Sequence, residues 1–122
     1  MENLNKLVDN YLQAWNERDD SLRLLKVPDA FTENACYDDP LMSGSGHSGI
    51  EAMIAAVQVQ MPKHRFEKAG PVEKVNKRIR FSWHLAEPGK AATLAGTDFC
   101  IVSPDGRISQ VAGFIDALEA SA

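Results

Sequence analysis

Apolar residues in the first part of the chain recur at helical spacing. The residues that would share one face of such a helix are Leu4, Leu7, Val8, Tyr11, Leu12 and Trp15. A stripe of this kind is typical of an amphipathic helix, so we predict a helix over residues 2–16. A second, short helix is predicted from Ser21 to Lys26, with Pro28 ending it. Its leucines are expected to face the interior, namely Leu22, Leu24 and Leu25.

The middle of the chain predicts a strand, a loop and a third helix. Ala35–Asp39 has the composition of a short strand, and Pro40 ends it. Residues 41–49 are rich in glycine and serine and are predicted to form a loop. Ser48 and Glu51 have the spacing of a capping box, so we expect the third helix to begin there.

From residue 64 onward the pattern favours strands. Five segments either alternate apolar with polar residues or are continuously apolar, and turn residues separate them. These segments are 64–67, 71–76, 78–85, 92–102 and 107–117. Segment 92–102 is apolar for nearly its whole length, which is typical of a central strand buried on both faces.

The order of these elements predicts the fold class. Two helices, a strand and a third helix precede a run of consecutive strands, which favours an α+β fold. We expect a curved antiparallel sheet with three helices packed on one face, forming a cone-shaped pocket, in a single domain of residues 1–122. A cavity between helices and a bent sheet is a usual place for a small-molecule site.

Charge and composition indicate which kinds of binding partner and which location to expect. The 122 residues include 13 Lys and Arg against 17 Asp and Glu, which leaves a formal net charge of −4. This balance gives no electrostatic reason to expect binding to nucleic acid or to a membrane. No apolar run approaches the roughly 20 residues of a membrane span, and no signal peptide is recognisable, so we expect a cytoplasmic protein. Cys36 and Cys100 are then expected to be free, buried thiols.

Asp98 is a candidate functional residue because it lies in the middle of the apolar segment 92–102. An ionised carboxylate in apolar surroundings is costly unless it is paired. We therefore expect Asp98 to be protonated, to be hydrogen-bonded, or to line a cavity. The residues that share its pocket would then define the chemistry.

Several short motifs occur in an order that resembles a known superfamily. They are Tyr11-Leu-Gln-Ala-Trp15-Asn16-Glu-Arg-Asp19, Tyr37-Asp-Asp39-Pro40, His47-Ser-Gly49-Ile-Glu-Ala, Gly96-Thr-Asp98-Phe99, Asp105-Gly106-Arg107-Ile108 and Gly113-Phe114. Together they resemble the nuclear transport factor 2-like superfamily, and within it the SnoaL-like polyketide cyclases and the ketosteroid isomerases. The resemblance covers essentially the whole chain.

The resemblance to the isomerases implies catalytic roles for three residues. Tyr11 holds the position of the tyrosine that donates a hydrogen bond to the substrate carbonyl. Asp39, before Pro40, holds that of the proton-shuttling base, and Asp98 that of the second donor to the oxyanion. In the polyketide cyclases, the aspartate at the position of Asp98 is itself the acid and base for ring closure. The implied reactions are isomerisation first and aldol-type cyclisation second, both without a cofactor.

The expected substrate is a small hydrophobic molecule that contains a carbonyl group. The residues expected to line its pocket are Trp15, Tyr37, Met53, Phe66, Trp83 and Phe114. No metal site is expected, because His47, His64 and His84 have no acidic or cysteine partner at ligand spacing. His47 is expected to make a capping or loop hydrogen bond.

Apolar residues on the outer face of the predicted sheet indicate how the protein assembles. Phe99, Ile101 and Phe81 are expected on the outer sheet face, which predicts a homodimer through the sheet, as the resemblance also implies.

A non-catalytic carrier of a small apolar ligand would have a cavity but carboxyl groups of Asp39 and Asp98 that point apart. A protein-interaction module would have its cavity filled by side chains.

Overall fold

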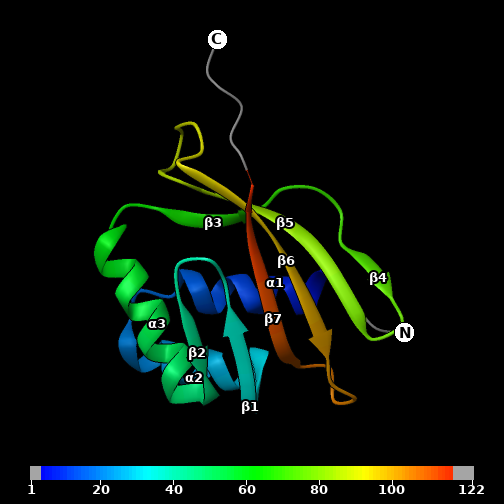
Figure 1. The fold of residues 1–122 in the computed structure, drawn as a ribbon. Helices are drawn as coiled ribbons and strands as arrows, with labels where there is room; N and C mark the ends of the chain where they lie inside the picture. Colours follow the sequence, from blue (N-terminus) through cyan, green and yellow to red (C-terminus); the bar gives the residue numbers. More distant parts are fainter. Residues whose placement is uncertain (1–3, 117–122) are drawn as a thin grey trace.

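The computed structural model describes residues 4–116 and contains three helices and seven strands (Figure 1). The helices are α1 (Leu4–Asn16), α2 (Asp20–Ala30) and α3 (Gly46–Gln60). The strands are β1 (Phe31–Asp38), β2 (Ser43–Ser45), β3 (Arg65–Lys68), β4 (Glu73–Val75), β5 (Arg78–Ala86), β6 (Leu94–Val102) and β7 (Ile108–Asp116). The predicted α+β class and the predicted first helix are confirmed, although residues 2–3 and 117, which the predicted elements included, lie outside the described residues.

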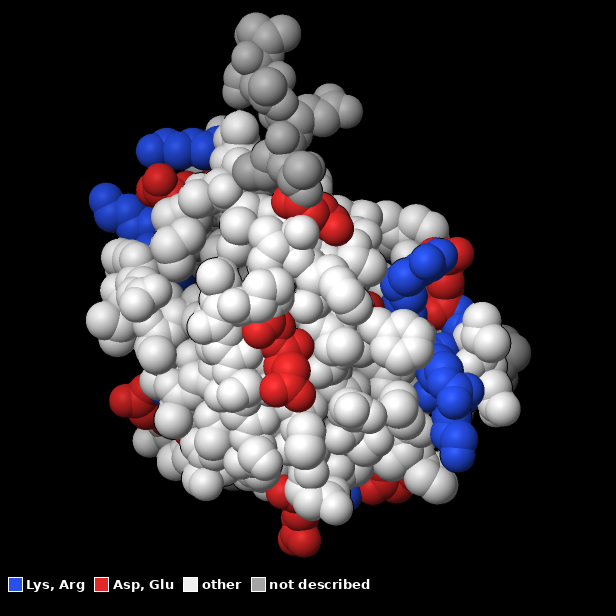
Figure 2. Space-filling model, in the orientation of Figure 1, with Lys and Arg blue, Asp and Glu red and all other residues white. Residues whose placement is uncertain are grey.

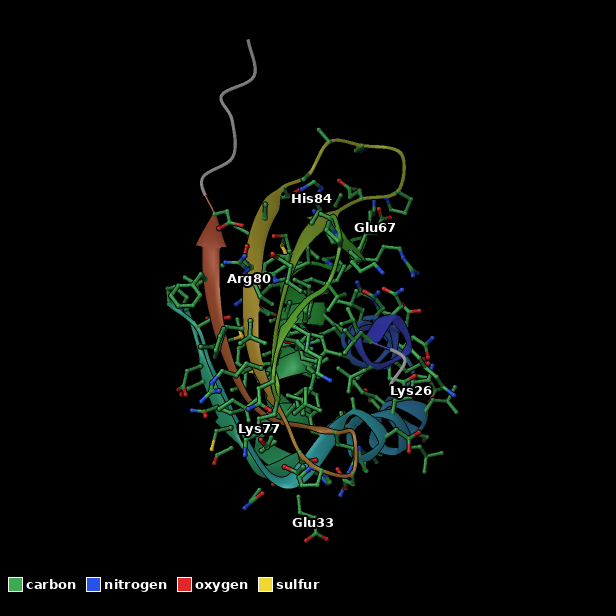
Figure 3. All side chains as sticks on the ribbon, turned by 90° about the vertical axis from the view of Figure 1, so that its right-hand side faces the viewer. Lys26, Glu33, Glu67, Lys77, Arg80 and His84 are labelled. Carbon is green, nitrogen blue, oxygen red and sulfur yellow. The ribbon has the colours of Figure 1, made fainter. Side chains whose placement is uncertain are left out.

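One curved sheet forms one layer of the molecule, and the helices lie against its inner face (Figure 3). Its strands are hydrogen-bonded in the order β2-β1-β7-β6-β5-β3, and β4 pairs with the first part of β5 on the edge where β3 pairs with its last part. Neighbouring strands are antiparallel except for β1 and β7, which run parallel. The predicted curved antiparallel sheet is therefore mixed at this one pair. Antiparallel neighbours can be joined by a tight hairpin, whereas β1 and β7 are far apart in the sequence and no hairpin sets their direction.

The outer face of the sheet is not covered by helices, so β6 is buried mainly on one side. Asp98 and Cys100 face the interior, whereas Phe99 between them is 38% exposed. The prediction that this strand is buried on both faces is therefore wrong. Phe81 was expected on the outer face but is buried on the inner face of β5, where its ring packs against that of Tyr11.

The two cysteines are both free thiols, as predicted, but they differ in exposure. Cys100 on β6 is buried, and burial raises the pKa of its thiol. Cys36 on β1 is exposed, because its neighbours Ala35 and Tyr37 occupy the inner face and the alternation of a strand turns Cys36 outward. The prediction that both are buried is therefore wrong for Cys36.

Helix α2 differs from its prediction in length and in orientation. It continues past Pro28 to Ala30, and the N–H of Phe31 still donates to the carbonyl oxygen of Val27. Pro28 lies only two residues before the end of the helix, so its missing N–H affects just the last turn. The inward face consists of Arg23, Val27 and Ala30. The leucines that were expected to face inward are exposed, namely Leu22, Leu24 and Leu25.

Arg23 takes the interior position that a leucine was expected to occupy. Its guanidinium is almost completely buried and donates to Glu51 Oε1 at 2.6 Å, to Gln58 Oε1 at 2.7 Å and to the carbonyl oxygen of Glu17 at 2.9 Å. It also pairs with Asp20 at the start of its own helix. One buried cation thus connects α2 to α3 and to the end of α1.

Helix α3 begins two residues earlier than the predicted capping box. Ser43–Ser45 forms β2, which pairs with Cys36–Asp38, so the chain leaves a strand and enters the helix directly. Gly46 has a φ of 71°, a conformation that glycine adopts without strain, and it makes this sharp junction possible. Segment 41–49 is therefore mostly regular structure rather than the predicted loop.

The helices that the structure describes include none that is long and apolar enough to span a membrane. Within the same residues, no group of three or more His, Cys, Asp and Glu side chains is arranged to hold a metal ion.

Candidate active site

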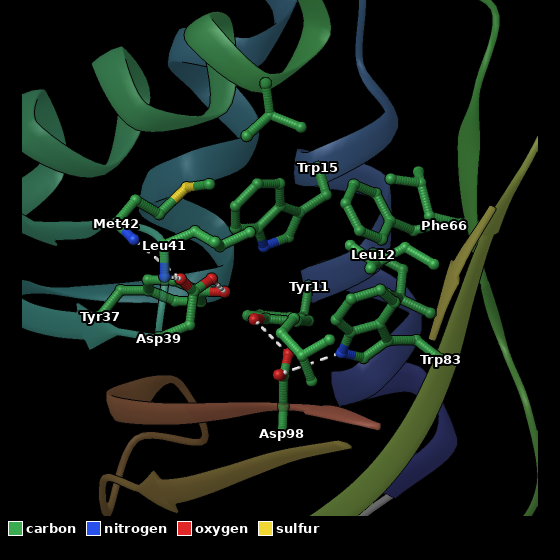
Figure 4. A pocket seen from close by; sticks show the side chains of 14 residues that line it. Tyr11, Leu12, Trp15, Tyr37, Asp39, Leu41, Met42, Phe66, Trp83 and Asp98 are labelled. Carbon is green, nitrogen blue, oxygen red and sulfur yellow. Dashed lines mark hydrogen bonds between the residues drawn. The ribbon is translucent and has the colours of Figure 1, made fainter. Parts of the chain in front are cut away.

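A small cavity lies between helix α1 and the inner face of the sheet (Figure 4). Its volume is about 50 Å³, enough for a few water-sized groups. Much of its wall is apolar and includes Leu12, Val57, Phe66, Leu85, Leu94 and Ile115. The polar groups that reach it belong to Tyr11, Trp15, Tyr37, Asp39, Trp83 and Asp98. The cavity is therefore apolar, with a few polar atoms at fixed positions, as small-molecule sites usually are.

Asp98 in the middle of β6 reaches this cavity and is only 2% exposed. The hydroxyl of Tyr11 donates to its Oδ2 at 2.7 Å, and the indole N–H of Trp83 donates to its Oδ1 at 3.0 Å (Figure 4). Each carboxyl oxygen thus has one donor from the protein. An ionised carboxylate offers about four lone-pair sites, so both oxygens can still accept a further proton.

The environment of Asp98 brings its proton equilibrium close to neutral pH. Burial, together with the negative charges of Asp39 and Asp116, raises the pKa of its carboxyl group to about 6, against the opposing effect of the hydrogen bonds from Tyr11 and Trp83. Burial, together with the charge of Asp98, also raises the pKa of Tyr11 well above its usual value. The Tyr11 phenol therefore stays protonated and remains a donor, whereas Asp98 can take up and release a proton.

Asp39 also lines the cavity, but its carboxyl oxygens serve a turn. Its Oδ1 accepts the backbone N–H groups of Leu41 at 2.7 Å and Met42 at 2.9 Å. Its Oδ2 accepts the hydroxyl of Tyr37 at 2.6 Å. Three hydrogen bonds thus make Asp39 the anchor of the segment that leaves β1, which is a common use of a short acid before a proline.

Two glycines allow these side chains to meet, and sequence reasoning did not foresee their role. A Cβ on Gly113 would stand 3.1 Å from both Asp39 Cβ and Asp98 Oδ1, so any larger residue there would crowd both acids. Gly96 lies opposite Trp83 in the sheet, and a Cβ there would overlap the indole ring. Trp83 can therefore lie across β6 and reach Asp98. Both glycines occur in the motifs above, but only the strand register reveals what they make room for.

Comparison with solved structures identifies relatives of the whole chain. It is similar to a candidate isomerase of the SnoaL-like family from Agrobacterium tumefaciens, with 41% sequence identity and a TM-score of 0.87. The match covers 92% of this chain and 96% of the other. The chain belongs to the SnoaL-like family. The resemblance found in the sequence is thus confirmed at the level of the family.

More distant structures share the fold of this SnoaL-like protein. A SnoaL-like protein of unknown function from Burkholderia thailandensis is 12% identical with a TM-score of 0.73, and the match covers 93% of this chain and 94% of that one. A candidate SnoaL-like polyketide cyclase from Jannaschia sp. is 12% identical with a TM-score of 0.67, covering 92% and 86%. Family models and curated protein sequences gave no match.

The SnoaL-like fold brings most of the sequence-predicted residues to one cavity. Tyr11, Asp39 and Asp98 all line it, as do four of the residues expected to bind substrate, namely Trp15, Tyr37, Phe66 and Trp83. Both acids line this cavity, with Asp39 Cβ and Asp98 Oδ1 beside Gly113, and the carboxyl oxygens of Asp39 accept hydrogen bonds from the turn and from Tyr37. A non-catalytic carrier therefore stays a prediction.

Two predicted lining residues lie elsewhere. Phe114 is 58% exposed, because Val111 and Gly113 occupy the inner face of β7 and the alternation turns Phe114 to the outer face. Met53 is buried on α3 and lines a neighbouring groove of about 520 Å³, which shares Leu41, Met42 and Val57 with the cavity. His47 bonds the carbonyl oxygen of Phe31 at 2.8 Å through its Nε2, in agreement with the predicted loop hydrogen bond.

Proposed function

We propose that this SnoaL-like protein is a cofactor-free isomerase that moves a proton on carbon next to the carbonyl group of a small hydrophobic substrate, with Asp98 as the proton carrier. The observation that carries this proposal is a buried carboxyl group with a pKa of about 6 that lines an apolar cavity. A general base works best when its pKa lies near the working pH. The similarity to a candidate SnoaL-like isomerase supports the same reaction class.

The proposed reaction needs one base that removes a proton from a carbon of the substrate and returns it to another carbon. Ionised Asp98 removes a proton from the carbon beside the carbonyl, and the electrons of the C–H bond move to the carbonyl oxygen as an enolate forms. The protonated Asp98 then delivers the same proton to another carbon of the conjugated enolate, and the carbonyl is restored. No atom or electron is gained or lost, so the product is an isomer of the substrate.

Tyr11 and Trp83 act in this proposal as positioning residues. Their hydrogen bonds to the two oxygens of Asp98 hold the carboxyl plane toward the cavity and favour its charged form. Both hydrogen bonds lower the pKa of Asp98. The pair therefore keeps a larger share of this buried acid ionised, which is the form that can accept a proton.

Ring closure is the alternative reaction, because a candidate SnoaL-like polyketide cyclase shares the fold. Aldol-type cyclisation would begin with the same proton abstraction by Asp98, so product analysis separates the two reactions. A cyclic product with a new carbon–carbon bond would favour the cyclase.

The test compares two aspartate variants on a panel of β,γ-unsaturated ketones, with the conjugated product followed by its ultraviolet absorbance. Asp98→Asn is expected to lower kcat by roughly 1,000-fold, within the usual contribution of a general base. Asp39→Asn can still accept the two backbone N–H groups of the turn, and we expect it to keep kcat within about tenfold of wild type.

The opposite ranking of the two variants would assign the base to Asp39, as the resemblance to ketosteroid isomerases implies. Absence of turnover by the wild-type protein on the whole panel would remove the isomerase proposal and favour a ligand carrier.

A further inference from the structure

The indole N–H of Trp15 is a donor buried inside the protein. Trp15 is 5% exposed, and its Nε1 has no hydrogen-bond acceptor among residues 4–116. Buried donors are paired in the great majority of cases, because an unpaired one loses the hydrogen bonds that water would give it. This donor therefore calls for an explanation.

The Trp15 ring is held in place by its neighbours. Its centroid lies 5.5 Å from that of Tyr37 and 5.2 Å from that of Phe66, with both rings tilted against it. The amide of Gln58 donates to the carbonyl oxygen of Trp15 at 3.0 Å, which fixes the backbone as well. The indole is thus a rigid donor rather than one that can turn to find a partner.

Trp15 lines the cavity that Asp98 also lines, and its indole nitrogen faces the space beside the Tyr11 hydroxyl (Figure 4). Three other side chains that line the cavity, within the part of the chain that the structure describes, carry an N–H or O–H donor. Each of them already donates to an acceptor. Tyr11 and Trp83 donate to Asp98, and Tyr37 donates to Asp39. Trp15 alone among these four offers a hydrogen bond to a molecule in the cavity.

We infer that Trp15 Nε1–H binds the carbonyl oxygen of the substrate and stabilises the negative charge that this oxygen gains in the enolate. This inference rests on the proposed function, because it supplies the oxyanion donor that the proton transfer by Asp98 requires. It also defines the substrate class. The described lining contains no Lys or Arg and does contain two carboxyl groups, so it favours an uncharged ketone, aldehyde or ester over a carboxylate.

The first test uses NMR on the ¹⁵N-labelled protein. The chain contains two tryptophans, Trp15 and Trp83, so two indole N–H signals are expected, and the Trp15→Phe variant assigns them. Cyclopentanone is the probe, and methylenecyclopentane, which has nearly the same shape but no oxygen, is the matched control. We expect cyclopentanone to move the Trp15 indole proton downfield, and the control to leave it near its starting position.

The second test measures affinity, with the Trp83 signal as the readout. Trp15→Phe keeps an aromatic ring but removes the donor, so it should weaken cyclopentanone binding by roughly tenfold, as expected for one hydrogen bond. Binding of methylenecyclopentane should not change. Equal weakening of both ligands would mean that Trp15 acts only by packing, and would overturn the inference.

The outcomes also separate this inference from the proposed function. If cyclopentanone shifts the Trp15 signal downfield but the protein shows no turnover, Trp15 binds a carbonyl group and the isomerase proposal is wrong. Turnover with no shift of the Trp15 signal, at any cyclopentanone concentration that can be reached, would retain the isomerase and remove the donor. Equal shifts with both ligands would likewise remove it.

Discussion

At the scale of single residues, the site is defined by how each polar atom is used. Asp98 and Asp39 are both aspartates on the wall of one cavity, yet their surroundings give them different tasks. Asp98 accepts only from side chains at the cavity, whereas Asp39 accepts two backbone N–H groups and a phenol. A carboxylate that is held by backbone donors fixes the shape of a turn, and one in apolar surroundings is available for proton transfer.

The raised pKa of Asp98 predicts how stability depends on pH. Its ordinary pKa of 3.8 applies to the unfolded chain, and burial raises it to about 6 in the folded protein. The folded state therefore holds the proton more tightly, and Asp98 stabilises it below pH 4 and loses that contribution as the pH rises through 6. Between pH 4 and pH 7, wild type should lose about 2 kcal/mol of unfolding free energy relative to Asp98→Asn.

Urea unfolding of both proteins at the two pH values measures this difference. The Asp98→Asn variant is the control because it removes the titrating group but keeps a similar size and shape. Parallel dependence on pH in the two proteins would show that Asp98 is not perturbed by folding.

At the scale of elements, the charged side chain of Arg23 holds helix α2 to its neighbours, in a place where the sequence predicted that leucines would pack. Arg23 connects this helix to Glu51 and Gln58 of α3 and to the end of α1, whereas the three leucines are exposed. One carboxyl oxygen of Glu51 is buried and has no hydrogen-bond partner within residues 4–116. Its charge is therefore compensated mainly by Arg23, so the three helices depend on this pair for their arrangement.

Removal of Arg23 should be strongly destabilising. Arg23→Met keeps much of the side-chain length but leaves the carboxylate of Glu51 without its cation, and we expect it to lower the unfolding free energy by about 3 kcal/mol. The double variant Arg23→Met/Glu51→Leu should recover much of this loss. The exposed Arg78 on β5 offers a matched control, for which Arg78→Met should change stability by less than about 0.5 kcal/mol.

Chemical denaturation of the four proteins tests this account. A loss for Arg23→Met as small as that of the Arg78 control would mean that packing, rather than the ion pair, holds α2.

At the scale of the whole molecule, the outer face of the sheet differs from the rest of the surface. Figure 2 views this face and shows mainly uncharged side chains, with most Lys and Arg toward its edges. Phe99 and Phe114 are 38% and 58% exposed on it, on the neighbouring strands β6 and β7. Large exposed aromatic residues on an open sheet are unusual for a monomer, and we propose that a second copy of the chain covers this face.

The state of assembly can be tested by size-exclusion chromatography with light scattering. Wild type is expected to have twice the mass of one chain, and Phe99→Asp/Phe114→Asp is expected to be a monomer, because charges replace the apolar contact. Leu25→Asp on the exposed side of α2 is the control and should leave the mass unchanged. A monomeric wild type would contradict the proposal.

Local pattern was sufficient for most of the elements and for the main candidate residue. The stripe from Leu4 to Trp15 gave the first helix, because burial of one helix face requires that spacing. The alternation along 78–85 gave the strand β5, although Phe81 was expected on its outer face and lies on its inner one. Asp98 could be selected because a carboxylate within an apolar segment is costly wherever that segment lies in the fold. These features depend only on neighbours in the sequence.

Only the tertiary structure decided which side chains are in contact. Tyr11 and Asp98 are 87 positions apart, and their hydrogen bond depends on where α1 packs on the sheet. The commitment of Asp39 to a turn, the outward position of Phe114 and the unpaired N–H of Trp15 likewise depend on register and packing. The physical reason is that moving a strand by one residue exchanges its two faces. A pattern of residue types can therefore list the groups of a site but cannot give the contacts among them.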